Sequence, residues 1–307
     1  MPVHSPSSLP ILKPGLYVTA TPIGRLEDLS ARARDTLEQA DWICAEDSRE
    51  TLKLLHALGL KRASRQILSL HAHNEARQIP EVLSLLGQSC SVALVSDAGT
   101  PGISDPGARL VQAVWDAGYR VSPVPGPSAV IAAASVSGFL TDADRPLTFW
   151  GFLPTRESAR RARYLTVLNH PGVSVCFEAP HRIHESLASA QEVLGDQCDI
   201  LLGREMTKSF ERFLRGTAQE VRAQLADDLS QDAHADHGEM VVVLSPKRQS
   251  TSGLSDELRL QWQGLLAGRL AKPQAAKLLS EALGISRDEA YDLVLEALQG
   301  LSRRPSE

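Results

Sequence analysis

The chain has 307 residues, which at roughly 150 residues per domain predicts about two domains. Hydrophobic residues make up 43% and charged residues 22%, which is typical of a globular protein and excludes a disordered, collagen-like or coiled-coil chain. The net charge of −5 excludes a protein that binds nucleic acid over its whole surface, so any such surface must be local.

The cysteines and the apolar runs predict a soluble, cytoplasmic protein. The four cysteines form no C-x-x-C pair and no zinc-ligand spacing, and Cys44 and Cys176 lie in apolar runs, so we expect buried free thiols. The longest uncharged, mostly apolar run, 129–140, is shorter than the roughly 20 residues that cross a bilayer. Residues 1–14 are rich in proline and lack an apolar signal core, which predicts a disordered tail.

Residues 15–140 are predicted to form an N-terminal α/β domain. Short β-rich runs at 16–20, 42–45, 66–70, 92–96 and 119–124 alternate with helical stretches, which indicates a sheet with helices on both faces. Asp105 is predicted to cap a helix that has Pro106 in its first turn and ends at Gly118. Gly59 and Gly87 are predicted to end two further helices.

The polar stretch 141–146 is predicted to link this domain to a second α/β domain, 147–245. Strands are expected at 147–152, 173–177, 200–203 and 240–244. A helix at 180–194 is predicted to end at Gly195, and the acidic, histidine-bearing stretch 227–237 is predicted to be a loop.

A second predicted linker, 246–253, precedes a small all-helical module at 254–302. Its last helix carries a capping box, because Ser286 and Glu289 can each satisfy the other's exposed backbone N–H group. The apolar positions Ala290, Leu293, Val294 and Ala297 fall on one face of that helix.

The common signatures of nucleotide, hydrolase and zinc sites are missing from the sequence. It has no G-x-G-x-x-G after the first strand, no G-x-x-x-x-G-K-[ST] and no G-x-S-x-G. His181 and His184 form H-x-x-H rather than H-E-x-x-H, and His71 and His73 have no further pair of ligands nearby. We therefore expect no metal site.

The segment V-S-D-A-G-T-P-G-I-S-D-P-G, 95–107, is predicted to bind a ligand. Asp97 closes a strand, Gly99 and Gly102 allow close approach of the backbone to a ligand, and Thr100 and Ser104 offer hydroxyl groups. In open α/β sheets, ligands bind beyond the carboxyl ends of the strands. A turn that binds no ligand would not need two acidic residues, two prolines and three glycines within thirteen residues.

Nine motifs occur in the order found in one known family. They are T-P-I-G (21–24), A-E-D-S-R (45–49), H-N-E (73–75), S-D-A-G-T-P with D-P-G (96–107), P-G-P-S (125–128), G-F-L-P (151–154), F-E-A-P-H-R (177–182), R-E-M-T-K (204–208) and G-E-M (238–240). In these motifs the chain resembles the ribosomal RNA small-subunit methyltransferase I family, which are cytidine 2′-O-methyltransferases of the tetrapyrrole-methylase superfamily. Arg25 stands where the family usually has asparagine, and Ser48 stands where it usually has threonine.

The resemblance implies two α/β domains with S-adenosylmethionine in the cleft between them, a homodimer and a ribosomal RNA substrate. Asp97 suits a cationic or hydroxyl-bearing part of the donor, and Phe177 and Met240 suit its adenine. In-line methyl transfer needs no metal. The expected cofactor-binding residues are Pro22, Asp97, Gly99, Thr100, Ile103, Ser104, Ser128, Phe177 and Met240.

Methyl transfer to a ribose also requires removal of a proton from a weakly acidic hydroxyl group. The candidates for this step are Glu46, Asp47, His73 and Lys208, together with Glu75 and Glu205. Each has an alternative role in a helix cap, an ion pair or a phosphate contact, so the sequence singles out no one residue as the base.

The sequence has one local basic cluster, at 156–163, in which four arginines stand against a single acidic residue. On composition alone it indicates a solvated helix face, but the family resemblance favours contact with RNA. The expected RNA-binding residues are Arg49, Arg156, Arg160, Arg161, Arg163, Arg182 and Lys208.

Two other functions remain as alternatives. One is a tetrapyrrole C-methyltransferase of the same superfamily, whose first loop would usually be G-x-G-P-G rather than T-P-I-G-R. The other is a non-catalytic RNA-binding assembly factor that keeps the fold.

Overall fold

The computed structural model describes residues 12–247, 270–283 and 286–301. The chain divides into two compact units, Met1–Pro246 and Lys247–Glu307. The predictions for residues 1–11, for the linker beyond Lys247, for the start of the helical module and for the side chain of Ala297 lie outside the described residues.

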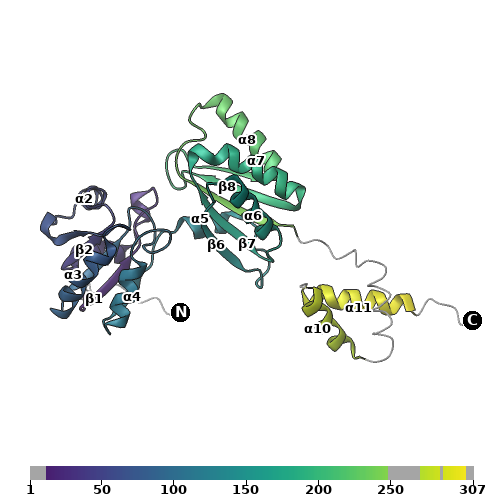
Figure 1. Cartoon of the computed structure of the whole chain (residues 1–307), viewed down its shortest axis with the longest axis horizontal. Helices are drawn as coiled ribbons and strands as arrows, with labels where there is room; N and C mark the ends of the chain where they lie inside the picture. Colours follow the sequence, from purple (N-terminus) through teal and green to yellow (C-terminus); the bar gives the residue numbers. More distant parts are fainter. Residues whose placement is uncertain (1–11, 248–269, 284–285, 302–307) are drawn as a thin grey trace, which may run out of the picture. The chain divides into compact units, whose positions relative to one another are not determined.

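The first sheet of Met1–Pro246 contains five parallel strands in the order β3-β2-β4-β1-β5. Figure 1 shows β1 and β2 of this sheet with helices beside them. Each expected strand is present, with its ends shifted by at most two residues. The strands are β1 (Gly15–Thr19), β2 (Trp42–Ala45), β3 (Ile67–Ser69), β4 (Ser91–Val95) and β5 (Val121–Val124). Because all five run in the same direction, the loops that follow them gather at one edge of the sheet.

Helices cover both faces of this sheet, as expected from the alternation of strand and helix. Ala93 and Val95 of β4 pack in a cluster with helices α1 (Ala31–Gln39) and α2 (Ser48–Ala57). Val92 and Leu94 point to the other face and pack with α3 (Glu75–Gly87) and α4 (Ala108–Asp116). Both faces of the strands are therefore buried, which explains their continuous apolar runs.

The helix ends agree only in part with the sequence predictions. Gly59 and Gly118 follow α2 and α4 with φ of 71° and 75°, as expected. Gly87 is the last residue of α3, and Ser89 takes the left-handed conformation instead. The prediction that Asp105 caps α4 is wrong, because α4 begins at Ala108 with Gly107 as its N-cap residue and no side-chain cap from it.

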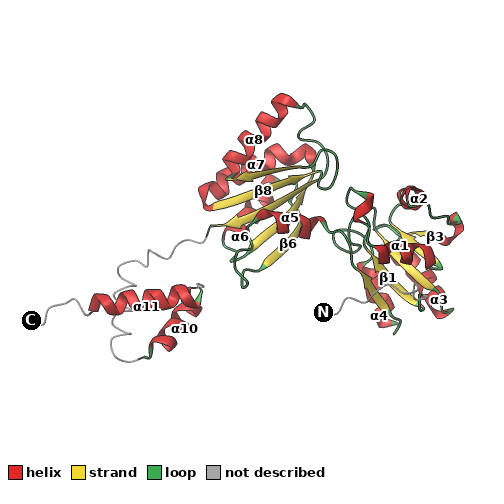
Figure 2. Cartoon of the chain, turned by 180° about the vertical axis from the view of Figure 1, so that it is seen from behind, coloured by secondary structure: helices red, strands yellow, loops and turns green. Residues whose placement is uncertain are grey.

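The second sheet is mixed and has the strand order β6-β7-β10-β8-β9. Figure 2 shows β6 and β8 of this sheet with helices packed beside them. Only β6 and β7 are parallel. Its strands are β6 (Leu147–Phe152), β7 (Val173–Glu178), β8 (Cys198–Arg204), β9 (Arg212–Gly216) and β10 (Met240–Pro246). The sequence prediction missed β9, an edge strand in which only Leu214 is buried.

Helix α5 (Ala129–Ser137) belongs by its packing to the second sheet, although the predicted first domain extended to residue 140. Its Val130 and Ala133 pack with Val175 and Val241 of that sheet. The opposite face is covered by α6 (Glu157–Leu168), α7 (Ile183–Leu194) and α8 (Ala218–Gln231). Helix α8 extends into the stretch expected to be a loop, and Gly195 ends α7 as predicted.

Short 3₁₀ turns occur at Leu26–Asp28, Ser64–Gln66, Pro180–Arg182 and Gly195–Gln197. In the unit Lys247–Glu307, helices α10 (Lys272–Leu283) and α11 (Arg287–Leu301) pack through Ala275, Leu279, Ala290 and Val294. The predicted capping box is confirmed. Glu289 N donates to Ser286 Oγ at 3.2 Å, and Ser286 N donates to Glu289 Oε2 at 3.0 Å.

Candidate functional site

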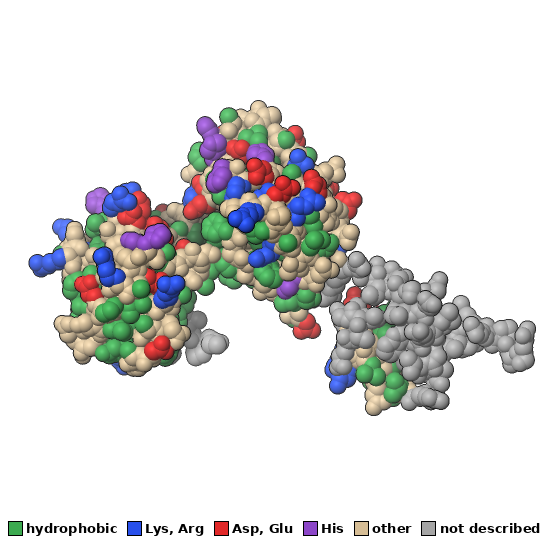
Figure 3. All heavy atoms as spheres, in the orientation of Figure 1, with side chains coloured by type: hydrophobic (Ala, Val, Ile, Leu, Met, Phe, Trp, Pro, Cys, Tyr) green, Lys and Arg blue, Asp and Glu red, His purple; other side chains and the backbone are tan. Residues whose placement is uncertain are grey.

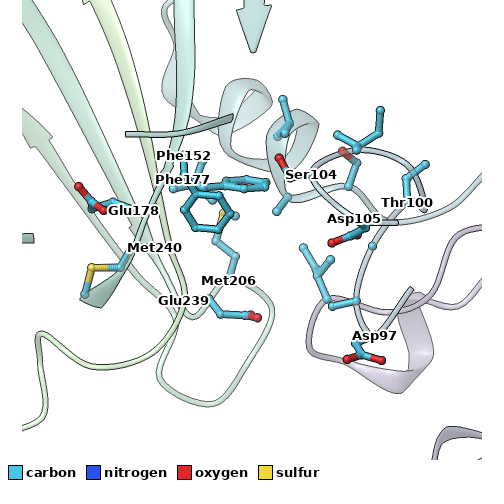
Figure 4. A pocket seen from close by; sticks show the side chains of 18 of the residues that line it. Asp97, Thr100, Ser104, Asp105, Phe152, Phe177, Glu178, Met206, Glu239 and Met240 are labelled. Atoms are coloured by element: carbon cyan, nitrogen blue, oxygen red, sulfur yellow. The ribbon is translucent and has the colours of Figure 1, made fainter. Parts of the chain in front are cut away.

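A cavity of about 400 Å³ is lined by residues from both sheets and their loops (Figure 4). One wall comes from the loops that follow β1, β2, β4 and β5. The other wall comes from β6, β7 and β10 and from the loop after β8. The cavity thus lies at the carboxyl edge of the first sheet, where the sequence predicted a ligand.

The loop after β4, residues 96–107, forms most of the first wall. It is tied to the loop after β1 by a pair of backbone hydrogen bonds between Thr21 and Gly99, at 2.8 and 3.1 Å. It is also tied to the loop after β5, because Thr100 Oγ1 donates to Pro127 O at 3.0 Å. Gly99 makes the turn with a φ of 80°, which glycine adopts readily. Ser104 has a φ of 65°, a left-handed conformation that is uncommon for a residue with a side chain.

The second wall is apolar and partly aromatic. The rings of Phe152 and Phe177 meet edge to face, with their centroids 5.5 Å apart. Met206 and Met240 line the same wall. Phe152 is 56% exposed, so much of its surface remains free for a ligand.

The cavity is strongly acidic. Glu46, Asp97 and Asp105 line its first wall, and Glu178 and Glu239 line the second, whereas no Lys, Arg or His side chain is among its described lining residues. Asp97 N donates to Glu46 Oε2 at 3.3 Å, so the first two carboxylates lie close together. Glu178 and Glu239 form ion pairs with Arg182 and Lys208, so the unpaired negative charge comes from the first wall. This charge favours a ligand that carries positive charge.

Burial and mutual repulsion perturb these carboxyl groups. Burial, followed by the charge of Glu46, raises the pKa of Asp105 to about 6. Burial is also the main cause that raises the pKa of Glu46 and that of Asp97 above their ordinary values. None of these three carboxylates forms an ion pair within the described part of the chain.

Lys208 suits neither of its predicted roles, as the proton acceptor or as an RNA-binding residue. Its Nζ donates to Glu205 Oε1 at 2.8 Å and to Glu239 Oε2 at 2.9 Å. Although burial acts in the opposite direction, these two hydrogen bonds hold the pKa of Lys208 above its ordinary value. A protonated amine that is occupied in this way is neither a base nor a free phosphate ligand, and Glu205 is occupied by the same contact.

Two further base candidates have structural roles. Asp47 accepts a hydrogen bond from Arg49 N at 2.8 Å, which caps α2. The side-chain hydrogen bond from Arg49 lowers the pKa of Asp47 to about 2, which makes it a weak base. Glu75 is buried and accepts two backbone N–H groups of the loop before α4 and of its first turn.

Among the predicted base candidates, Glu46 alone lines the cavity, and exposed His73 does not. All the predicted cofactor-binding residues line it except Pro22, whose neighbour Ile23 does. The prediction missed Asp105, Phe152, Met206 and Glu239. All four belong to the quoted motifs, but the motifs do not show which side chains face the cavity.

The arginine cluster does not form one cationic surface. Arg160 is 2% exposed and donates to the carbonyl groups of Pro154 and Thr155, at 3.5 and 3.3 Å, so its prediction as an RNA-binding residue is wrong. Arg161 pairs with Glu192, and Arg163 lies over the ring of Trp150 at 4.7 Å.

Arg156 is exposed, and the Arg49 side chain is 83% exposed although it pairs with Asp47 at 2.6 Å. Arg182, by contrast, is 12% exposed and pairs with the buried Glu178 at 2.5 Å. On the face shown in Figure 3, positive and negative side chains are interspersed over the part of the chain that contains the second sheet.

Two further observations concern the described residues alone. Their histidine, cysteine and acidic side chains form no group of three or more that is suited to a metal ion. The helices in the same ranges are too short or too polar to cross a membrane.

Comparisons with solved structures agree with this architecture. The methyltransferase CobJ matches with a TM-score of 0.54 at 17% identity, over 76% of this chain and 94% of its own. The cobalamin biosynthetic enzyme cobalt precorrin-4 methyltransferase, CbiF, matches with a TM-score of 0.52 at 16% identity, over 74% of this chain and 93% of its own. At such identities the likeness shows the fold.

The sequence itself is much closer to other proteins. The chain is 42% identical to the ribosomal RNA small subunit methyltransferase I of Xylella fastidiosa, over 90% of this chain and 97% of that protein. It is 40% identical to the protein of the same name from Neisseria meningitidis, over 91% of this chain and 92% of that one. The sequence model of the tetrapyrrole (corrin/porphyrin) methylases matches residues 15–222. The chain therefore belongs to the tetrapyrrole methylases and, within them, to the ribosomal RNA small subunit methyltransferase I family.

Proposed function

We propose that the protein transfers a methyl group from S-adenosylmethionine to the 2′-hydroxyl of a cytidine in small-subunit ribosomal RNA. The observation that carries this proposal is an acidic, partly aromatic cavity in a chain about 40% identical to ribosomal RNA methyltransferases over nine tenths of its length. An RNA substrate of this kind also fits action in the cytoplasm.

The residues of the cavity suit this donor. Its volume of about 400 Å³ falls in the usual range for small-molecule sites. Phe152 and Phe177 offer an aromatic wall for the adenine, and Asp97 and Asp105 offer negative charge to the cationic portion. The donor supplies an electrophilic methyl group on its sulfonium, and the protein has to orient it and exclude competing water.

The acceptor hydroxyl needs a nearby proton acceptor. Glu46 and Asp105 line the cavity and belong to no ion pair among the described residues. Burial raises the pKa of Asp105 to about 6, near neutrality, which suits general-base catalysis. We therefore favour Asp105 as the proton acceptor, with Glu46 as the alternative.

We propose fewer RNA-contacting residues than the sequence suggested. Arg156 is exposed, and the Arg49 side chain is also exposed although it pairs with Asp47 at 2.6 Å. Arg160 and Arg182 are buried or nearly so, and Lys208 is held by two carboxylates. Exposed arginines neutralise phosphates and release counterions, so their contribution should depend on salt.

A second copy of the chain is the proposed partner for α5. Ile131 and Val136 on this helix are 58% and 54% exposed, and Leu140 beyond its end is 41% exposed. An apolar surface of this kind favours association. Light scattering should show a dimer, and Ile131→Asp with Val136→Asp should shift it toward the monomer without loss of donor binding.

Calorimetry tests the donor site directly. Asp97→Asn keeps an acceptor for Asp47 N, which donates to Asp97 Oδ1 at 3.0 Å, but removes the charge. We expect donor binding to weaken by about 1–3 kcal/mol. The matched control is Asp28→Asn, an exposed carboxylate outside the cavity, which should bind as the wild type does. Equal affinity of the Asp97 variant and the wild type would contradict this site.

A further inference from the structure

The H-N-E motif, 73–75, lies outside the cavity lining, and two of its side chains have well-defined contacts. Asn74 Oδ1 accepts from His71 N at 2.8 Å, and Asn74 Nδ2 donates to Ser69 O at 3.0 Å. These two bonds close the turn that follows β3. They fix the start of α3, where Glu75 is the first residue.

Glu75 reaches from α3 to the start of α4. Its side chain is buried, with the residue 5% exposed, and its Oε1 accepts from Gly107 N at 3.1 Å and from Leu110 N at 3.0 Å. The N-cap residue of α4 is Gly107, which has no side chain to satisfy these N–H groups. Glu75 therefore caps α4 from another helix, and its negative charge also suits the positive end of the α4 dipole.

No larger residue could replace Gly107 and provide the cap itself. The φ of Gly107 is 121°, and an added Cβ would lie 2.8 Å from Leu94 Cδ2 in the core. The cap must come from elsewhere in the fold, and Glu75 supplies it.

The same contact ends the loop that forms the first wall of the cavity. This loop is fixed at its start by β4, in its first half by the Thr21–Gly99 bridge and the Thr100 hydroxyl, and at Gly107 by Glu75. Ser104 and Asp105 lie between the last two anchors, and Ser104 is held with a φ of 65°. Loss of the last anchor frees this stretch to relax away from its position in the wall.

We propose that Glu75 is a positioning residue for the donor site: by capping α4 it holds Ser104 and Asp105 in the cavity wall. This inference rests on the proposed function, because it takes that wall to contact the methyl donor. Glu75 itself is buried and does not line the cavity.

The test compares Glu75→Ala with Glu75→Gln and a control elsewhere in the sheet. Ala removes both hydrogen bonds, whereas the amide oxygen of Gln can still accept them. The matched control is Asp41→Ala, because Asp41 Oδ2 also accepts two hydrogen bonds, from Ser91 N and Ser91 Oγ, both at 2.7 Å. Those bonds lie at the start of β4, the opposite edge of the sheet from the cavity.

The readouts are calorimetric affinity for S-adenosylmethionine without RNA, thermal stability, and kcat and KM for the donor. We expect Glu75→Ala to weaken donor binding by about tenfold or more and to raise the donor KM in parallel. It should also lower kcat at saturating donor, because Asp105, the favoured proton acceptor, leaves its position. Glu75→Gln should stay within about threefold of the wild type, and Asp41→Ala should lower the melting temperature without weakening donor binding.

Several results would overturn the inference. One is a folded Glu75→Ala variant with wild-type donor affinity, and another is a loss of affinity in Asp41→Ala as large as that in Glu75→Ala. A third is a Glu75→Gln variant with intact donor affinity but little kcat, which would give Glu75 a chemical role. If Glu75→Ala does not fold, Glu75→Asp replaces it, and its shorter side chain should give a smaller loss of the same kind. A wild-type protein that does not bind the donor would instead contradict the proposed function.

Discussion

The backbone N–H of Arg25 donates a hydrogen bond to Thr207 Oγ1 at 3.2 Å, which joins the loop after β1 to the loop after β8. The neighbouring residues Ile23 and Met206 both line the cavity. Glu205 and Thr207 adopt positive φ, 48° and 65°, so the second loop is held in a strained conformation at this contact. The fit of these two loops closes one end of the proposed donor site.

Gly24 shows how close this contact is. An added Cβ would lie 2.4 Å from Thr207 Oγ1 and 2.7 Å from Lys208 Cγ. We expect Gly24→Ala to lower the free energy of unfolding by about 1–3 kcal/mol and to weaken donor binding, because the loops must separate. Urea unfolding and calorimetry measure the two effects. Adding Thr207→Ala should recover part of both, and a Gly24→Ala protein with wild-type stability and affinity would show that the loops do not pack in this way.

Asp105 should make stability depend on pH. The folded protein holds the Asp105 proton up to about pH 6, whereas the group ordinarily releases it near 3.8. Between these values the folded state binds more protons, so the free energy of unfolding falls as the pH rises through this window. Asp105→Asn should therefore stabilise the protein at pH 7 by about 1 kcal/mol or less, since solvent screens this half-buried group, and should change little at pH 4. An equal effect at both pH values would contradict the raised pKa.

Donor binding should have the opposite dependence on pH. A cationic donor favours ionised carboxylates, so affinity for S-adenosylmethionine should rise with pH up to about 6 and then level off. Calorimetry at pH 5 and 7.5 measures this, with S-adenosylhomocysteine, whose sulfur is uncharged, as the control ligand. The affinity for S-adenosylhomocysteine should depend less on pH. Asp105→Asn should reduce the pH dependence of the affinity for S-adenosylmethionine. A donor affinity that does not change with pH would contradict the proposed contact.

Arg160 and Arg156 should behave differently although they lie four residues apart. Arg160→Met removes the hydrogen bonds of a buried guanidinium to the carbonyl groups of Pro154 and Thr155 and should cost about 2–4 kcal/mol of stability. Arg156→Gln should leave stability unchanged, weaken RNA binding and lower its salt slope by about one. The measurements are thermal unfolding and RNA titration at several salt concentrations. A stable Arg160→Met protein that has lost only RNA affinity would contradict the structural role.

The sequence predicted the first sheet and most of the cavity because their signals are local. Parallel strands place the loops after them at one edge, and the loop from Asp97 to Ser104 carries its glycines and hydroxyl groups in one short stretch. The prediction failed where a contact joins distant segments. The cap of α4 comes from Glu75 rather than from nearby Asp105, and no local pattern shows this.

Arg160 illustrates a second limit. It lies on the same face of α6 as the buried residues Tyr164 and Val167, so helical periodicity places it toward the core. A cluster of four arginines suggested a surface instead, because buried guanidinium groups are rare. The carbonyl groups that satisfy Arg160 precede α6, and only the folded loop brings them into reach.

The most direct test of the proposed function is transfer of isotope-labelled methyl from S-adenosylmethionine. The full chain is incubated with small ribosomal subunits, with free small-subunit RNA and with a tetrapyrrole precursor, followed by digestion of the RNA to nucleosides. The proposal predicts label in 2′-O-methylcytidine from the ribosomal substrate, none in the tetrapyrrole, and a strong reduction with Asp97→Asn. Label in the tetrapyrrole, or donor binding without any label in RNA, would contradict it.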